Sequence, residues 1–229
     1  MNKYSIIVAG GSGVRMGSVI PKQFMLLAGQ PLLMHTIKAF VNCGMKEIIV
    51  VIPLPFIDYW RTLTNEYNFN IPHITVAGGL FRSQSVVQGL SAINEDEAII
   101  AIHDGVRPLV SESLINQAFQ LAEEKGSAVP YIDLTESIRY ISKEENKHID
   151  REKYKIIQTP QCFSLSVLKH IYHTQEIRSF TDDASLVEKH GVVIHMFKGS
   201  EENIKITTPL DMIIAEAILQ NRTSTVIEK

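Results

Sequence analysis

A chain of 229 residues that is 45% hydrophobic and 21% charged has the length and composition of one large globular domain or two small ones. Its formal net charge of −3 provides no global basic field for nucleic acid, so an anionic ligand must be held by local clusters of positive charge. The sequence has no uninterrupted apolar run of about 18 residues, which excludes a membrane span.

The first residues and the two cysteines predict the cellular setting. Met1–Ala9 is a short apolar segment that runs into glycines, without the basic start or the small-residue cleavage site of a signal peptide. Cys43 and Cys162 do not form a C-x-x-C pair and suit a reducing compartment. We therefore expect a cytoplasmic protein.

Short β-branched segments alternate with helical periodicity along most of the chain. Strands are expected over residues 5–9, 47–52, 73–76 and 98–102. Helices are expected over residues 33–40, from just after Pro55 to about residue 67, and over residues 83–93. A further helix is expected from a Ser111 cap to Lys125, where Gly126 ends it. Continuous apolar strands separated by helices are typical of a parallel sheet covered on both faces. The pattern predicts a single doubly wound, mostly parallel α/β domain over residues 1–229.

This alternation breaks between about residues 133 and 158. The segment is polar, and its hydrophilic tip at residues 143–148 is preceded by Ile138 and followed by Ile149. We interpret it as a protruding hairpin-like arm of the same domain; the alternative is a flexible surface excursion.

Three further elements are expected after the arm. They are a helix capped by Ser164, a strand over residues 192–197, and a last helix that opens at Thr208-Pro209-Leu210-Asp211. Threonine at the N-cap and proline at the first helical position are a typical helix start.

A glycine-rich loop follows the first strand. Residues 9–17 are Ala-Gly-Gly-Ser-Gly-Val-Arg-Met-Gly, and the backbone amides of such a loop can face a phosphate chain. A Walker A loop is excluded because Gly17 is followed by Ser-Val rather than by Lys and a hydroxyl residue. The dinucleotide fingerprint is disfavoured because Met16 stands where it needs Gly or Ala, and no acidic residue ends the second strand. Four glycines beside Arg15 and Lys22 exceed what a tight turn requires.

The loop and several later motifs carry a resemblance to a known family. Gly-x-Gly-x-Arg-Met, followed by Pro21-Lys22-Gln23, resembles the start of nucleotidyltransferases that activate sugar and alcohol phosphates with a nucleoside triphosphate. The later motifs are Gly79-x-x-Arg82-x-x-Ser85, His103-Asp104-Gly105-Val106-Arg107-Pro108, Gln158-Thr159-Pro160-Gln161, Thr181-Asp182-Asp183-Ala184-Ser185 and Asn203-Ile204-Lys205-Ile206-Thr207. In this order they resemble the 2-C-methyl-D-erythritol 4-phosphate cytidylyltransferases of the non-mevalonate isoprenoid pathway, over nearly the whole chain. Gly105 and Val106 depart from the family's usual His-Asp-Ala-Ala-Arg-Pro.

The resemblance implies a reaction with defined chemical needs. A phosphomonoester oxygen of methylerythritol phosphate attacks the α-phosphorus of CTP, which forms 4-diphosphocytidyl-2-C-methyl-D-erythritol and releases pyrophosphate. A phosphomonoester is largely dianionic near neutral pH, so the reaction needs no general base. It needs two polyanions aligned and the charge on the α-phosphate stabilised, which cations, backbone amides and Mg²⁺ can supply.

The resemblance also assigns roles to individual residues. The residues that it implies for catalysis are Arg15, Lys22, Arg151 and Lys205. Those that it implies for CTP are Ala9, Gly10, Gly11, Ser12, Gly13, Arg82, Ser85, Asp104 and Gly105. Those that it implies for the phosphorylated polyol are Asp104, Arg107, Arg151, Thr159, Thr181 and Lys205. The expected cofactor is Mg²⁺ or another divalent cation. Asp104 is the candidate ligand of this metal, because it follows an apolar strand at the edge where open α/β sheets bind ligands.

The family's arm embraces a second subunit. The resemblance therefore implies a homodimer in which Arg151 acts in the active site of the partner. The net charge of −3 and the lack of a long apolar run predict no nucleic-acid or membrane partner.

Other interpretations remain open at several of these positions. Ser85 and Asp104 can be capping residues, and Arg107 can pair with Asp104 instead of binding phosphate. Asp182 and Asp183 can cap the helix that follows them. His103 is expected to be buried and hydrogen-bonded rather than catalytic.

Other functions also remain open. A ribitol-5-phosphate cytidylyltransferase shares the glycine loop, Pro-Lys-Gln-Phe and Asn-Ile-Lys-Ile-Thr, but the sequence of residues 181–188 favours the isoprenoid enzyme. A dinucleotide oxidoreductase is disfavoured by Met16, and a non-catalytic nucleotide-binding module by the intact set of cations.

Overall fold

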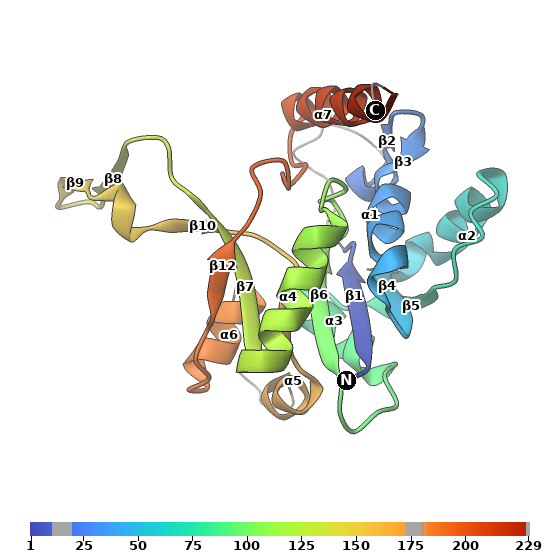
Figure 1. The fold of residues 1–229 in the computed structure, drawn as a ribbon, viewed down its shortest axis with the longest axis horizontal. Helices are drawn as coiled ribbons and strands as arrows, with labels where there is room; N and C mark the ends of the chain where they lie inside the picture. Colours follow the sequence, from blue (N-terminus) through green and yellow to red (C-terminus); the bar gives the residue numbers. More distant parts are fainter. Residues whose placement is uncertain (11–19, 173–179, 181, 228–229) are drawn as a thin grey trace.

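The structure is a computed structural model that describes residues 1–10, 20–172, 180 and 182–227, with side chains to residue 222. One eight-stranded sheet forms its centre (Figure 1). Its strands are β1 (Lys3–Val8), β4 (Glu47–Pro53), β5 (Ile74–Gly78), β6 (Ile99–Asp104), β7 (Ser127–Asp133), β10 (Lys155–Ile157), β11 (Gln161–Ser164) and β12 (Met196–Lys198). Their order is β10-β7-β11-β6-β1-β4-β5, and β12 pairs with β7. The strands β6, β1, β4 and β5 run parallel to one another, whereas β11 runs antiparallel to both of its neighbours, β6 and β7.

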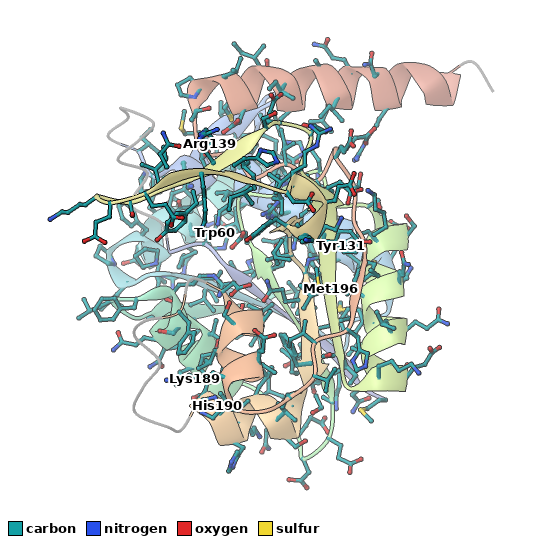
Figure 2. The ribbon with its side chains drawn as sticks, turned by 90° about the vertical axis from the view of Figure 1, so that its left-hand side faces the viewer. Trp60, Tyr131, Arg139, Lys189, His190 and Met196 are labelled. Carbon is teal, nitrogen blue, oxygen red and sulfur yellow. The ribbon has the colours of Figure 1, made fainter. Side chains whose placement is uncertain are left out.

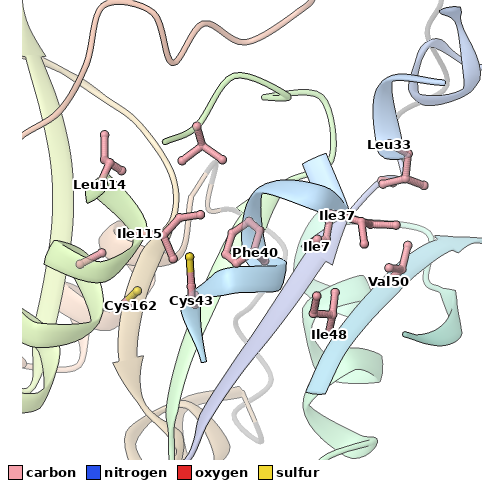
Figure 3. Packing of buried hydrophobic residues seen from close by; sticks show 14 of the residues in the cluster. Ile7, Leu33, Ile37, Phe40, Cys43, Ile48, Val50, Leu114, Ile115 and Cys162 are labelled. Carbon is pink, nitrogen blue, oxygen red and sulfur yellow. The ribbon is translucent and has the colours of Figure 1, made fainter. Parts of the chain in front are cut away.

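Helices cover both faces of this sheet, which confirms the predicted α/β class. One face carries α1 (Leu32–Phe40), α2 (Ile57–Glu66) and α4 (Glu112–Lys125), and the other carries α3 (Arg82–Ser91), α5 (Leu165–Tyr172) and α6 (Asp183–Lys189) (Figure 1). Because successive strand side chains point to opposite faces, Ile7 of β1 packs in the first layer and Ile6 in the second. Figure 3 shows the first layer, in which Ile37 and Phe40 of α1 are fully buried.

Helix ends follow the expected chemistry. Ser111 accepts a hydrogen bond from the Leu114 amide at 3.2 Å, and Gly126 ends α4 with a φ of 85°. The last helix, α7 (Pro209–Ile227), begins directly after Thr208. The Asp211 carboxylate accepts hydrogen bonds from the Thr208 amide at 2.7 Å and from the Thr207 amide. The Thr208 hydroxyl accepts from the Asp211 amide at 3.4 Å. The predicted caps at Ser111 and Thr208 are therefore confirmed.

The strand expected over residues 192–197 is wrong for its first four residues, since β12 begins at Met196. The Ser127 hydroxyl holds this part of the chain, together with one backbone hydrogen bond from the Val129 amide to the His195 carbonyl at 2.9 Å. The hydroxyl donates to the Val193 carbonyl at 2.7 Å and accepts from the His195 amide at 3.0 Å. The Val193 side chain is 68% exposed, so the apolar run does not form a buried strand.

The arm is a separate two-stranded antiparallel sheet of β8 (Ile138–Ile141) and β9 (Asn146–Ile149). It projects from the body between β7 and β10, and a short 3-10 helix, Arg151–Lys153, lies on its return (Figure 1). Figure 2, in which the arm faces the viewer, labels Arg139 on β8. Arg139 donates through Nε to Asn146 Oδ1 across the hairpin at 2.6 Å. The predicted hairpin is confirmed.

The remaining elements are short. They are the strands β2 (Leu26–Leu27) and β3 (Gln30–Pro31) and the 3-10 helices at Lys22–Phe24, Val41–Cys43 and Leu54–Phe56. In the described part of the chain, none of the helices combines the length and the apolar character that crossing a bilayer requires.

Candidate active site

The candidate site lies at the point where the order of the sheet reverses. From β1 the chain adds β4 and β5 on one side and then returns to place β6 on the other side of β1. The loops after β1 and β6 therefore diverge, which leaves a crevice at the carboxyl ends of these strands. A cleft of about 290 Å³ occupies this place, here called the cationic cleft. Its lining residues are Val8, Ala9, Gly10, Lys22, Gln23, Arg82, Ser85, Asp104, Val106 and Lys205.

A second cleft of about 320 Å³ adjoins the cationic cleft and shares Arg82, Asp104 and Lys205 with it. Its other lining residues are Arg107, Ile157, Gln158, Thr159, Gln161, Asp182 and Ser185. The predicted positions Thr159 and Arg107 thus lie beside the cleft that holds Lys22.

Asp104 is the electrostatic centre of both clefts. Its Oδ2 lies 3.0 Å from Lys205 Nζ and 3.2 Å from Arg107 Nε, and its Oδ1 lies 3.7 Å from Arg82 Nε. Burial would raise the pKa of Asp104, but these three cations outweigh burial and hold the pKa well below its usual value. The four cations at the two clefts, Lys22, Arg82, Arg107 and Lys205, outnumber by one the carboxylates of Asp104, Asp182 and Asp183, the last of which pairs with Arg82. The surplus positive charge suits a polyanionic ligand.

Lys22 and Lys205 come from distant parts of the sequence and are joined through one short segment. Lys22 Nζ donates to the Ile206 carbonyl at 3.2 Å, and the Ile206 amide donates to the Val106 carbonyl at 2.9 Å. These bonds attach the segment that carries Lys205 to the loop after β6. The two lysines predicted for catalysis therefore line one cleft.

Asn203 fixes the other end of this segment. It is fully buried, and its Nδ2 donates to the Thr159 carbonyl at 2.8 Å. Its own carbonyl accepts from Arg107 Nη1 at 2.7 Å. Arg107 is thus buried between Asn203 and Asp104, and of its two predicted interpretations the structure shows the pair with Asp104.

His103 is buried and hydrogen-bonded, as expected. Its Nε2 lies 3.2 Å from the Arg107 carbonyl, which can only accept, so Nε2 carries the hydrogen. Its Nδ1 therefore accepts from the Thr159 hydroxyl at 3.0 Å, and that hydroxyl in turn accepts from the Asp104 amide at 3.1 Å. Burial lowers the pKa of His103 to about 4, so the ring is neutral near pH 7. The network holds Asp104 in place at the end of β6.

Ser85 connects the end of β5 to α3. It is the fourth residue of α3 and not its N-cap, so the capping interpretation is wrong. Its hydroxyl accepts from the Gly79 amide at 3.2 Å and donates to the Phe81 carbonyl at 3.2 Å. A Cβ on Gly78 would lie 2.9 Å from Ser85 Oγ, which explains why glycine stands at that position.

Ala9 and Gly105 lie at the strand ends beneath the cleft. The Ala9 amide donates to the Val51 carbonyl and the Gly105 amide to the Val8 carbonyl, each at 2.8 Å. Their amides are therefore used within the sheet. Gln23, which sequence reasoning did not single out although it follows Lys22 in Pro-Lys-Gln, donates to the Ala9 carbonyl at 2.7 Å.

Arg82 bridges two carboxylates. Its Nη1 lies 2.7 Å from Asp183 Oδ2, and its Nε faces Asp104. Burial would lower the pKa of Arg82, but the two carboxylates raise it above its usual value. Asp182, not Asp183, caps α6, since it accepts from the Ser185 amide at 3.2 Å. The role of Asp183 as the partner of Arg82 was not predicted.

Arg151 is the one described catalytic candidate that lies elsewhere. It is exposed in the 3-10 helix of the arm, donates to the Thr135 carbonyl, and is not among the described residues that line the two clefts. Five other predicted positions, namely Gly11, Ser12, Gly13, Arg15 and Thr181, lie outside the described residues.

Asp104 is the side chain on which a metal prediction rests. Among the residues that the structure describes, no group of three or more His, Cys, Asp or Glu side chains could hold a metal ion. Mg²⁺ commonly takes only one or two carboxylates and completes its shell with substrate phosphates and water. The donor set therefore fits a metal that arrives with a phosphorylated ligand and does not fit a protein-only metal cage.

Fold and site together define the class. A doubly wound α/β sheet with surplus positive charge at its switch point is typical of proteins that bind nucleotides or other phosphorylated ligands.

Comparison with known proteins narrows this class to one family. The family of 2-C-methyl-D-erythritol 4-phosphate cytidylyltransferases matches residues 4–221. The chain is 42% identical over 220 residues to the enzyme of that name from Bacteroides thetaiotaomicron, which covers 96% of this chain and all of the relative. It is 45% identical over 219 residues to the one from Azobacteroides pseudotrichonymphae, with 95% and 98% covered. The chain belongs to this family of enzymes.

Solved structures agree with the assignment. The crystal structure of the 2-C-methyl-D-erythritol 4-phosphate cytidylyltransferase from Thermus thermophilus has a TM-score of 0.77 at 27% identity, covering 96% of this chain and 100% of that one. The 4-diphosphocytidyl-2C-methyl-D-erythritol synthase from Anaerococcus prevotii has a TM-score of 0.81 at 26% identity, covering 96% and 98%.

Proposed function

We propose that this chain transfers CMP from CTP to 2-C-methyl-D-erythritol 4-phosphate, giving 4-diphosphocytidyl-2-C-methyl-D-erythritol and pyrophosphate. The observation that carries the proposal is the cationic cleft at the switch point, in a chain of this family. Lys22, Arg82 and Lys205 line it around the single carboxylate of Asp104. Such a cleft can bring two polyanions together and neutralise their repulsion.

In the proposed reaction a phosphate oxygen of the acceptor forms a bond to the α-phosphorus, and the bond from this phosphorus to the oxygen of the leaving pyrophosphate breaks. The acceptor phosphate is already a dianion, so no side chain has to remove a proton. Lys22 stabilises the charge that develops on the α-phosphate, and Arg82 holds CTP. Lys205 orients the acceptor phosphate. Asp104 keeps Arg82, Arg107 and Lys205 fixed before the ligands arrive, so little reorganisation is needed during reaction.

We further propose Mg²⁺ as the metal of the reaction. Asp104 would provide one carboxylate oxygen, and the phosphates of CTP would provide most of the remaining ligands. When bound, the ion neutralises triphosphate charge.

We also propose a cytoplasmic homodimer formed through the arm, in which Arg151 completes the site of the partner subunit. Arg151 is exposed and outside the described lining of its own clefts, and Tyr140 and Ile141 of β8 are 47% and 72% exposed. Apolar side chains at such positions suit burial against another chain. The two free cysteines, Cys43 and Cys162, suit a reducing compartment.

The acceptor is tested by pyrophosphate release from CTP with purified protein and Mg²⁺. We expect a far higher kcat/KM with methylerythritol phosphate than with ribitol 5-phosphate, and no release after EDTA treatment. The reverse ranking would assign the chain to ribitol phosphate, and release without any acceptor would identify a CTP hydrolase.

A further inference from the structure

A series of polar side chains, Tyr172, Asp183, Arg82 and Asp104, connects the end of α5 to the cationic cleft. Tyr172, the last residue of α5, donates its hydroxyl hydrogen bond to Asp183 Oδ1 at the start of α6. Asp183 Oδ2 lies 2.7 Å from Arg82 Nη1 at the start of α3, and Arg82 Nε lies 3.7 Å from Asp104 Oδ1. Three helices on one face of the sheet are thus tied to the end of β6.

Among the residues that the structure describes, Arg82 links the two inner members of this series, Tyr172 and Asp183, to the clefts. Asp183 is fully buried and Tyr172 is 6% exposed, and neither is among the described residues that line the two clefts. Burying a carboxylate without a partner for its charge lowers the stability of the folded protein, so Asp183 depends on the ion pair with Arg82. The Arg82 side chain is 25% exposed, so its guanidinium links this buried anion to the cleft.

Tyr172 determines how Asp183 presents its charge. Burial and the neighbouring Asp183 raise the pKa of Tyr172 well above its usual value, so the hydroxyl stays protonated and donates. This bond occupies Oδ1 and leaves Oδ2 for Arg82. Without the hydroxyl, Oδ1 loses this donor, and the carboxylate can bring both of its oxygens to the guanidinium. The guanidinium of Arg82 would then rotate, and its Nε would no longer face Asp104 Oδ1.

We propose that Tyr172, acting through Asp183, is a positioning residue that fixes the guanidinium of Arg82 for binding CTP. The proposal rests on the proposed function, because it specifies how the nucleotide is held in that same site. It assigns a role to the contact between α5 and α6, far along the sequence from every motif of the glycine loop.

The test is Tyr172→Phe, which removes only the hydroxyl, with Tyr4→Phe as the matched control. Tyr4 is also buried, at 3% exposure, and its hydroxyl also donates to a carboxylate, Glu95, at 3.0 Å, but it lies at the opposite end of β1. We expect Tyr172→Phe to raise the Kd and KM of CTP about fivefold, because the guanidinium of Arg82 is no longer held in its binding geometry, an effect equal to about one ordinary hydrogen bond. The kcat and the KM of the acceptor at saturating CTP should stay near wild type. In Tyr4→Phe all of these values should remain unchanged.

A double variant that combines Tyr172→Phe with Arg82→Gln distinguishes a role in positioning Arg82 from a general loss of stability. In Arg82→Gln protein the guanidinium is gone, so adding Tyr172→Phe should leave the Kd of CTP, measured by calorimetry, unchanged. An equal CTP affinity for Tyr172→Phe and Tyr4→Phe would overturn the proposal. So would a fivefold loss that persists in the Arg82→Gln background.

The same measurements test the proposed function and the role of Tyr172 separately. If wild-type protein binds CTP but releases no pyrophosphate with the acceptor, the proposed function fails while the ratio of CTP affinities still tests Tyr172. If wild-type protein transfers CMP but Tyr172→Phe binds CTP normally, the role of Tyr172 is wrong and the function stands. Wild-type protein that binds no CTP contradicts both.

Discussion

At the scale of single residues, the chemistry depends on a few cations held in fixed positions around Asp104. Lys22, Arg82, Arg107 and Lys205 are drawn from four separate segments, and three of them contact the same carboxylate. A preorganised set of this kind stabilises charge without having to rearrange in the transition state. The roles of the individual cations can therefore be separated by kinetics.

Lys22→Ala should lower kcat about 100-fold, because the ammonium stabilises charge that develops only in the transition state. The KM values should change much less. Lys38→Ala is the matched control, since Lys38 is an exposed lysine of α1 that bonds to Gln30. Steady-state pyrophosphate release measures both variants. A Lys22→Ala enzyme that turns over like Lys38→Ala would remove Lys22 from the α-phosphate.

The neutral His103 predicts how stability depends on pH. Its pKa is about 4 in the folded protein and near 6.5 when unfolded, so between pH 7 and pH 5 the unfolded chain takes up a proton that the folded chain does not. The free energy of unfolding should therefore fall by about 2 kcal/mol from this site as the pH drops across that range. Burial also lowers the pKa of His35, which adds in the same direction.

Denaturant unfolding at pH 7 and pH 5 checks the share of His103. His103→Gln keeps a donor and an acceptor but does not titrate, so its stability should fall by about 2 kcal/mol less than that of wild type over the same range. Asp104 does not change stability between pH 7 and pH 5. Its pKa is lowered in the folded protein, so the stability that it contributes is lost only when the pH falls below the usual pKa of an aspartate. Identical pH dependences in the two proteins would contradict the assignment.

At the scale of elements, a strand could be predicted from the sequence where its own residues are sufficient to determine it. The strands β1, β4 and β6 are continuous apolar runs buried on both faces, and their pattern was sufficient. The strands β7 and β11 were not predicted, since each contains buried polar residues such as Ser127 and Gln161. Their hydrogen bonds come from segments distant in the sequence, which no local period reveals.

The candidate site divides in the same way. Lys22, Arg82, Asp104 and Lys205 were predicted because they belong to motifs that resemble a family, and the structure brings them into one cleft. The partnership of Asp183 with Arg82 was not predictable, because it depends on how α6 packs beside α3. The sequence alone could not decide between the two interpretations of Arg107.

Ser111 offers a test of one local prediction. Its side chain caps α4, so Ser111→Ala should lower the free energy of unfolding by about 1 kcal/mol without changing the kinetic constants. Ser91→Ala at the end of α3 is the control, since that hydroxyl donates to the Val87 carbonyl within its own helix. Chemical denaturation compares the two variants. Equal stabilities would show that the cap contributes nothing.

At the scale of the whole molecule, the arm decides whether one chain suffices. In the proposed dimer each active site combines Lys22 of one subunit with Arg151 of the other. Lys22→Ala and Arg151→Ala homodimers should each be nearly inactive. A mixed dimer would have one site with both changes and one with neither, so refolding equal amounts together should restore about a quarter of wild-type activity. No recovery, with mixed dimers shown to be present, would place Arg151 outside the partner's site.

The central claim is that the cationic cleft transfers the α-phosphate of CTP with its nucleoside to a phosphorylated alcohol. The most direct measurement uses CTP labelled with radioactive phosphorus at either the α- or the γ-phosphate, with methylerythritol phosphate and Mg²⁺, in wild-type and Lys22→Ala protein. We predict that the α label enters the diphosphocytidyl product and the γ label enters pyrophosphate, and that Lys22→Ala does so about 100-fold more slowly. Transfer of the γ label to the acceptor, or recovery of the α label only as free CMP, would contradict the account.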